Sequence, residues 1–163
     1  MKIVVVGCGR VGGFLAGILD QEGHEVTIVD LERAWFVHLP ERFKGTTLLG
    51  DGTDLEVLRQ AGIEGADALL ALTEGDNRNL MAAQIAKEIF GVKKVLAKVN
   101  DPIRAQMYRG RGIDTFSRTT ILGALLHASL TGNAELGSRL LARAKRHEAE
   151  LSGEAAAEPA SSA

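Results

Sequence analysis

The sequence alternates between short apolar runs and segments in which apolar residues recur every three or four positions. Short β-branched runs such as "KIVVV" predict strands buried on both faces, and the second spacing predicts amphipathic helices. Strands are predicted at 2–6, 26–30, 46–51, 66–72, 94–99 and 113–116. Strands that alternate with helices this regularly predict a parallel sheet with helices on both faces.

Local start and stop signals mark several of the intervening helices. Gly23 is placed to end the first helix. Thr53, followed three residues later by Glu56, is a capping-box signature for a helix over 53–62. The segment 31–43, which contains Pro40, gives no clear prediction.

Two further helices follow the fourth and fifth strands. One is expected to begin at Asp76 or Asn77, and Asp101 followed by Pro102 is a good start for the other. In the first of them we expect an apolar stripe made of Met81, Ile85 and Ile89. The complete pattern predicts a doubly wound, Rossmann-like α/β fold of about six strands.

Beyond Thr120 the pattern changes. Residues 121–130 form a predicted helix that is apolar nearly all round, which packs either on its own domain or on another copy of the chain. A basic, polar helix is predicted over 135–150, and 152–163 is of low complexity. We therefore divide the chain into a domain at 1–118, C-terminal helices at 119–150 that form a subunit contact, and a disordered tail at 151–163.

Composition narrows the possible functions. A chain of 163 residues suits one domain, and its net charge of −2 argues against binding nucleic acid. Cys8 is the only cysteine and the first apolar run is too short for a signal peptide, so we expect a cytoplasmic protein without an internal disulfide. The four histidines do not have the spacing of metal ligands, so no metal site is predicted.

A glycine motif with the spacing G-x-G-x-x-G follows the first strand and opens a helix, which is the context such a motif requires. Gly7 permits the tight turn, Gly9 lets the backbone approach a phosphate, and Gly12 lets the helix pack close to the sheet. The amides of this turn, those of Cys8 and Val11 included, are predicted to hold phosphates at the helix N-terminus.

Charged residues beside the motif suggest which ligand it takes. Asp30 and the following Leu31 lie at the end of the second strand, where a carboxylate accepts hydrogen bonds from ribose hydroxyls and disfavours NADP. Arg33 lies close to Asp30 in the sequence and could attract a 2′-phosphate, so binding of NADP is disfavoured but not excluded. Arg10 opposes the helix dipole by about 0.3–1 kcal/mol, a cost that a bound phosphate would offset; the alternative is a solvated side chain.

The ends of the other strands supply further candidates, because ligands of such sheets bind there. Asp51 with Gly52, Thr73 and Lys98 are predicted to contact the ligand. The alternative for each is turn chemistry or helix capping. For Cys8 the alternatives are a thiol with a lowered pKa and a small residue that fills space against the sheet, and we expect the second.

Taken together, these stretches resemble the TrkA-N family, the N-terminal domain of regulators of K⁺ conductance. The resemblance covers residues 1 to about 118 and rests on "VVVGCGRVGGFLAGIL", "GHEVTIVD", "GDGTDLEVLRQAGIEGADALLALTEGDNRNL" and "KVLAKVNDPIRAQMYRGRGIDTF". It includes the pattern T-x-x-D-x-x-N formed by Thr73, Asp76 and Asn79.

The resemblance implies binding of NAD(H) or of ATP, ADP or AMP by a dimer or a ring that acts on a membrane potassium transporter or channel. It implies a crossover helix at 119–130 that contacts another subunit, and peripheral association with the inner face of the membrane. Relatives often continue into a C-terminal lobe. This chain resembles the N-terminal domain alone, which implies either a separate polypeptide for that lobe or a minimal regulator.

Two other functions compete with a nucleotide sensor. One is an NAD-dependent oxidoreductase, and the other is an assembly module with a vestigial site. Hydride transfer needs an acid or base beside the nicotinamide, and Tyr108 is followed four residues later by Gly112 rather than lysine. We therefore predict no catalytic residues and a regulatory protein rather than an enzyme.

Overall fold

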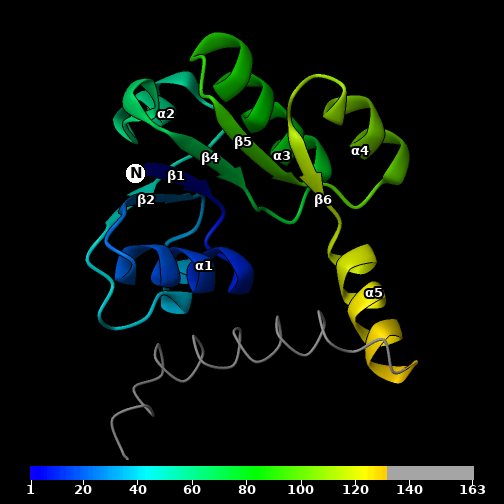
Figure 1. The fold of residues 1–163 in the computed structure, drawn as a ribbon. Coiled ribbons are helices and arrows are strands. Elements are labelled where there is room, and N and C mark those ends of the chain that lie inside the picture. The colour runs from blue at the N-terminus through cyan, green and yellow to red at the C-terminus, as the bar shows by residue number, and fades with distance from the viewer. Residues whose placement is uncertain (132–163) are drawn as a thin grey trace, which may run out of the picture. The chain divides into compact units, whose positions relative to one another are not determined.

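The computed structural model describes residues 1–131. Its compact unit, Met1–Ile121, contains a six-stranded sheet in which every neighbouring pair is parallel (Figure 1). The strands are β1 (Lys2–Val6), β2 (Glu25–Asp30), β3 (Thr46–Leu49), β4 (Ala68–Ala71), β5 (Lys94–Lys98) and β6 (Asp114–Phe116). The predicted Rossmann-like fold is confirmed.

The strand order across the sheet is β3-β2-β1-β4-β5-β6. Strands β2 and β3 therefore lie on one side of β1, and β4, β5 and β6 lie on the other side. Val6, the last residue of β1, lies opposite Val29 of β2 and Ala71 of β4. The carboxyl ends of these three strands therefore lie side by side. In open sheets of this kind a crevice forms where the order reverses.

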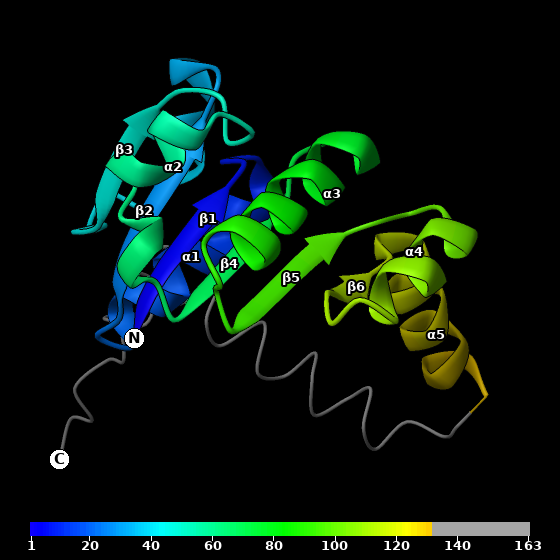
Figure 2. The ribbon, with the colours of Figure 1, turned by 90° about the horizontal axis from the view of Figure 1, so that it is seen from above.

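Helices cover both faces of the sheet. They are α1 (Arg10–Gln21), α2 (Leu55–Gln60), α3 (Asp76–Gln84), which continues into the π-helical turn η3 (Ile85–Ile89), and α4 (Pro102–Arg109), with the 3-10 helices η1 (Arg33–His38) and η2 (Ile63–Gly65). Helix α1 covers one face, and α2, α3 and α4 cover the other (Figures 1 and 2). Helix α5 spans Arg118–Leu130.

The core consists of two apolar clusters separated by the sheet. In β1, Val4 and Val6 belong to the cluster under α2 and α3, whereas Ile3 and Val5 belong to the cluster under α1 and η1. All four side chains are buried, which explains why β1 is an uninterrupted apolar run.

Helix α1 packs on the sheet through small residues. Gly12, Gly13, Ala16 and Gly17 are its buried positions, and the helix ends before Gly23, whose φ is +82°. The predicted stop at Gly23 is confirmed. Gly12 brings the first turn of α1 against the Gly7 carbonyl group, and Gly13 brings it against His38 of η1.

Two local predictions are wrong. Helix α2 is capped by Asp54 and not by Thr53, since the Asp54 carboxylate accepts hydrogen bonds from the N–H groups of Glu56 (2.7 Å) and Val57 (3.2 Å). Of the apolar stripe predicted in the helix after β4, Ile85 packs against the core, but Met81 and Ile89 are 52% and 58% exposed. The buried positions of α3 and η3 are Asn79, Leu80, Ala82, Ala83 and Ala86, small enough in the main to let the helix lie close to the sheet.

The C-terminal predictions are met only in part. Helix α5 is present where an apolar helix was expected, and it buries none of its side chains within the described chain. The predicted helix at 135–150 and the predicted tail at 151–163 lie outside the described residues. Between residues 1 and 131, no helix combines the length and the apolar character needed to cross a bilayer.

Candidate functional site

A cavity of about 590 Å³ opens at the carboxyl ends of β1, β2, β4 and β5. It lies where the strand order reverses, as expected for a ligand site in this fold. Of the predicted contact residues, those that line it are Gly7, Gly9, Arg10, Val11, Asp30, Leu31, Gly52, Thr73 and Lys98. Cys8, Gly12 and Asp51 do not line it.

The fold itself requires glycine at the first and last positions of the motif. Gly7 has a φ of +104°, and a Cβ atom there would lie 2.8 Å from the backbone nitrogen of Thr73. A Cβ atom on Gly12 would lie 1.9 Å from the carbonyl oxygen of Gly7. These two glycines therefore allow the turn and the close approach of α1, whether or not a ligand is bound.

Gly9 differs from the other two. Its φ of −67° is open to any residue, and a Cβ atom there would meet nothing within 4 Å. The fold therefore does not require glycine at this position, and Gly9 is one of the residues that line the cavity.

The N-terminus of α1 carries partial positive charge that no side chain of its own cap or first turn offsets. Gly9 provides no side-chain cap, the first turn holds no acidic residue, and its first residue is the exposed Arg10. The first N–H groups of an α-helix have no acceptor within the helix. Together with the helix dipole and the guanidinium group, they make this end of the cavity attractive to an anion.

Asp30 is held in place by the turn it faces. Its Oδ2 accepts a hydrogen bond from the N–H of Cys8 (2.6 Å), and its Oδ1 accepts one from the N–H of Glu32 (3.0 Å). Each carboxylate oxygen can accept a second hydrogen bond. The side chain is therefore fixed beside the glycine turn and retains the capacity to bind hydroxyl groups.

Cys8 is a buried packing residue. Its side chain belongs to the cluster under α1, and burial, together with the nearby Asp30 charge, raises the pKa of its thiol to about 12. The alternative of a lowered pKa is wrong, because desolvation and a neighbouring carboxylate both oppose the thiolate. Its N–H, which we expected to bind phosphate, is donated to Asp30 instead.

Asp51 organises its own turn. Its Oδ1 accepts hydrogen bonds from the N–H (2.9 Å) and the hydroxyl (2.8 Å) of Thr53. Of this segment, the glycines at positions 50 and 52 line the cavity. A Cβ atom on Gly52 would lie 2.2 Å from Cγ1 of Val6, so the loop after β3 approaches the end of β1 closely.

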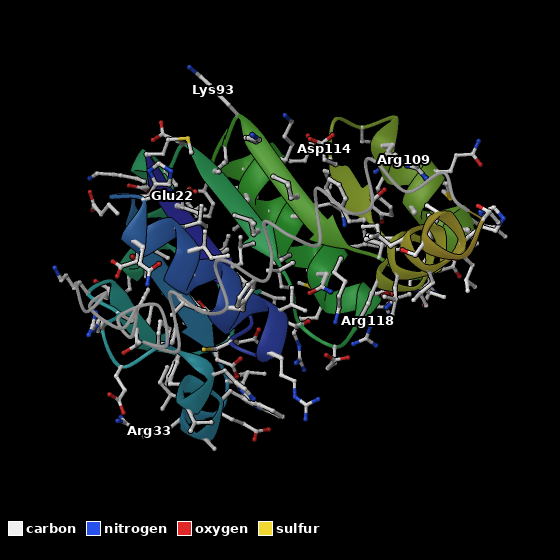
Figure 3. The ribbon with its side chains drawn as sticks, turned by 60° about the horizontal axis from the view of Figure 1, so that its bottom comes forward. Glu22, Arg33, Lys93, Arg109, Asp114 and Arg118 are labelled. Atoms are coloured by element: carbon white, nitrogen blue, oxygen red, sulfur yellow. The ribbon has the colours of Figure 1, made fainter. Side chains whose placement is uncertain are left out.

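Positively charged side chains gather where β4 and β5 end. Lys98 is only 6% exposed, and its Nζ lies 3.2 Å from Oε1 of Glu74. Nη1 of Arg118 lies 4.0 Å from the same oxygen, and Figure 3 shows this arginine beside the start of α3. Arg78 and Arg10 also line the cavity.

Several lining residues were missed by the sequence analysis: Gly50, Glu32, Trp35, Glu74, Arg78 and Arg118. Glu74 was detectable, because it lies in the loop that follows a predicted strand. Arg118 also follows a strand, but that strand is β6, which lies at the edge of the sheet, so its end was not an expected part of the cavity. Trp35 was not detectable, because its segment gave no clear periodicity.

Comparison with known proteins decides the family. The model of the TrkA-N domain matches residues 3–118. The chain belongs to the TrkA-N family.

Two curated relatives of this TrkA-N domain are potassium uptake proteins. The Trk system potassium uptake protein TrkA of Streptomyces coelicolor is 47% identical over 115 residues, which are 71% of this chain and 52% of the relative. The TrkA homolog of Methanothermobacter thermautotrophicus is 32% identical over 114 residues, which are 70% of this chain and 52% of the relative. The chain thus spans about half the length of the curated relatives it matches.

Solved structures share the fold. The TrkA-N domain of the inner membrane protein ybaL from Escherichia coli has a TM-score of 0.71 at 18% identity, over 79% of this chain and 96% of that one. The Kef CTD of Shewanella denitrificans in its AMP-bound form has a TM-score of 0.65 at 21% identity, over 96% of this chain and 99% of that one. The GsuK channel bound to NAD has a TM-score of 0.63 at 22% identity, over 75% of this chain and 22% of that one.

In this TrkA-N domain, the Asn79 side chain joins the ends of β4 and β5. Its Oδ1 accepts from the N–H (2.8 Å) and the hydroxyl (2.7 Å) of Thr73, and its Nδ2 donates to the carbonyl oxygens of Thr73 (2.9 Å) and Lys98 (2.8 Å). Asn79 is fully buried, so these bonds satisfy all its polar atoms. It thereby fixes two residues of the cavity wall.

Asp76 fastens the loop after β5 and does not cap its own helix. Its Oδ2 accepts hydrogen bonds from the N–H groups of Asn100 and Asp101, both at 2.9 Å. Burial opposes its ionisation, but these bonds and the nearby Arg104 and Lys98 outweigh burial, so its pKa lies below the ordinary value. Asp76 and Asn79 of the pattern T-x-x-D-x-x-N therefore stabilise the backbone of the cavity wall by hydrogen bonds and do not line the cavity themselves.

No metal centre is visible in the part of the chain that the structure describes. Residues 1–131 contain no group of three or more histidine, cysteine, aspartate and glutamate side chains that could hold an ion. The polar and aromatic groups that line the cavity include backbone amides, carboxylates, positively charged side chains and one indole ring.

Proposed function

We propose that this TrkA-N domain binds an adenine nucleotide, either NAD(H) or AMP, ADP or ATP, and regulates a potassium transporter or channel. The observation that carries this proposal is the uncapped start of α1, which faces a cavity of about 590 Å³ beside the fixed carboxylate of Asp30. The AMP- and NAD-bound structures with the same fold support the ligand class.

The order of groups in the cavity suggests how the nucleotide lies. Asp30 would accept hydrogen bonds from the ribose hydroxyls, and the amides at the start of α1 would hold the phosphate groups. Asp30 and Glu32 together would repel a 2′-phosphate, which disfavours NADP. Arg33 does not line the cavity, and its side chain points outward (Figure 3).

The cations at the other end give the domain a means to distinguish ligands by charge. A phosphate group beyond the first would come under the influence of Arg10, Arg78, Lys98 and Arg118, and would compete with Glu74 for the last two. Ligands with different phosphate charge would then favour different arrangements of the assembly. Only such a difference in affinity between two states can shift their equilibrium.

We propose a regulatory role and not hydride transfer. Within the described chain, no histidine, tyrosine or cysteine lines the cavity. The lining lysine is paired with Glu74. The names of the relatives, which are Trk system uptake proteins, support the same conclusion.

The proposed assembly is a homodimer or a larger ring that acts on a membrane potassium transporter or channel from the cytoplasmic side. Helix α5 would supply the subunit contact, because Leu122, Leu126 and Leu130 are each more than half exposed. In this proposal residues 1–118 form the nucleotide-binding domain and 119–150 the contact region.

Isothermal titration calorimetry on the purified chain tests the proposal, with NAD⁺, NADH, AMP, ADP, ATP and NADP⁺ as ligands. We expect saturable binding of at least one adenine nucleotide and weaker binding of NADP⁺ than of NAD⁺. Asp30→Asn should weaken NAD⁺, NADH, AMP, ADP and ATP, whereas Asp114→Asn, an equal loss of charge at an exposed position outside the cavity (Figure 3), should weaken none.

Two results would overturn the proposal. Binding of none of these nucleotides would remove the sensor function altogether. Turnover of NADH in the presence of hydroxy or keto acids would instead assign the domain to the oxidoreductases.

A further inference from the structure

Trp35 is the only tryptophan of the chain and forms part of the cavity wall. It lies in η1, the short 3-10 helix that follows β2, and it is 44% exposed. Exposing nearly half of such a large apolar side chain is unfavourable unless something covers it. Neither the fold nor the phosphate chemistry described above explains why an indole lies there.

His38 supports the indole. The two rings are stacked, with centroids 5.5 Å apart and planes inclined by 17°. Nδ1 of His38 lies 3.0 Å from the carbonyl oxygen of Trp35 and 3.2 Å from that of Cys8. Both partners can only accept, so Nδ1 carries the hydrogen. His38 thus ties η1 to the glycine turn and holds the indole beside it.

The lining groups change in character across the sheet. The loops after β2 and β3 supply Trp35, Leu31 and the two glycines at 50 and 52; β1 supplies the glycine turn; and β4 and β5 supply the cationic end. A nucleotide is likewise ordered as base, ribose and phosphate. With the ribose at Asp30 and the phosphate at the turn, the base is directed to the side of Trp35.

We infer that Trp35 is the surface on which the base of the nucleotide stacks, with His38 as its positioning residue. This inference rests on the proposed function and adds which residue recognises the base. Stacking on an aromatic ring accepts any flat base and rejects a sugar phosphate that has none. Trp35 would therefore set the preference for nucleotides over ribose phosphates, whereas the turn and the cations would respond to charge.

The fluorescence of Trp35 provides a direct readout, because no other tryptophan contributes to the signal. We expect AMP to quench or shift this emission saturably, with the same Kd as calorimetry gives. Ribose 5-phosphate, which keeps the sugar and the phosphate but lacks the base, should bind without that change.

Three variants locate the effect. Trp35→Ala should weaken AMP at least about tenfold, as expected for the loss of one base–aromatic stack, and should leave the Kd of ribose 5-phosphate unchanged. Trp35→Phe should recover most of the lost affinity. Val37→Ala, in the same short helix but 80% exposed and outside the cavity, is the matched control and should bind AMP like the parent chain.

The outcomes separate this inference from the proposed function. If the parent chain binds AMP or NAD⁺ but Trp35→Ala does so equally well, the stacking role is refuted and the nucleotide site stands. If Trp35→Ala weakens AMP and ribose 5-phosphate by the same factor, Trp35 only supports the fold of the turn and the inference also fails. If the parent chain binds no nucleotide, the inference and the proposed function fail together.

Discussion

Gly9→Ala adds one methyl group at a position where the protein leaves room for it, and so separates the requirements of the fold from those of the ligand. The backbone there has an ordinary φ, and the new Cβ atom would meet nothing within 4 Å. Alanine is a poorer N-cap than glycine, which costs a few tenths of a kcal/mol up to about 1 kcal/mol. The unfolded chain has less conformational entropy with alanine than with glycine, which stabilises the folded state by about 0.4–1 kcal/mol. The free energy of unfolding should therefore change by less than about 0.5 kcal/mol.

The effect on binding should be much larger. Because Gly9 lines the cavity, a methyl group on it should hinder the approach of the proposed phosphate to the amides of the turn. If it displaces the phosphate from even one turn amide, a charge-assisted hydrogen bond worth about 1.5–3 kcal/mol is lost. This corresponds to a rise of roughly 10- to 150-fold in the Kd for AMP.

Urea denaturation and calorimetric titration of the same samples measure the two effects separately. Gly65→Ala is a matched control, because its Cβ atom would also meet nothing within 4 Å and Gly65 does not line the cavity; neither stability nor binding should change. Gly12→Ala should instead destabilise the fold by about 3 kcal/mol or more, since its Cβ atom would overlap the Gly7 carbonyl. If Gly9→Ala binds AMP like the parent chain, phosphate does not approach the turn at Gly9.

Three further predictions concern charge, pH and assembly. Arg10→Ala should weaken ATP more than ADP and ADP more than AMP in calorimetry, while Arg42→Ala, an equal loss of charge outside the cavity, should weaken none; equal weakening of all three by Arg10→Ala would show that Arg10 does not read phosphate charge. The pKa of Asp76 is lowered in the folded protein, so its carboxylate contributes stability above the ordinary value of 3.8 and loses that contribution as the pH falls through the folded-state pKa. Asp76→Asn should therefore cost about 1 kcal/mol in urea denaturation at pH 7, and a cost that persists undiminished at acid pH would contradict this assignment. Leu126→Asp should yield monomers in light scattering, whereas Ala124→Asp, on the opposite side of α5, should not; an unchanged oligomer for Leu126→Asp would exclude this helix face as the contact.

The layout of the sheet and the position of the cavity could be predicted because both depend on local patterns. Short apolar runs mark strands buried on both faces. The motif places glycine at Gly7, whose φ of +104° only glycine adopts easily, and at Gly12, where a Cβ atom has no room. Asp30 lines the cavity because it ends a strand next to that turn; its contact with a ligand stays a prediction.

The roles of buried polar residues could not be predicted in this way. Asp76 and Asn79 lie at ordinary helix-start positions, but their side chains bond to segments 19 to 25 residues farther along the chain or back to the end of β4. Only the three-dimensional pairing of β4 with β5 brings those partners together. Likewise, the stripe of Met81 and Ile89 was wrong because alanines, which carry little periodic signal, form the face of α3 that lies on the sheet.

The buried amide of Asn79 has a consequence for the thermodynamics of binding. Four hydrogen bonds from this one side chain hold the ends of β4 and β5 together, so the shape of this half of the cavity depends on contacts within the protein. A ligand that reaches Thr73 and Lys98 therefore loses little affinity to ordering their backbone. The ion pair between Lys98 and the exposed Glu74 involves side chains alone, so a ligand could replace Glu74 at Lys98 without a change in the strands.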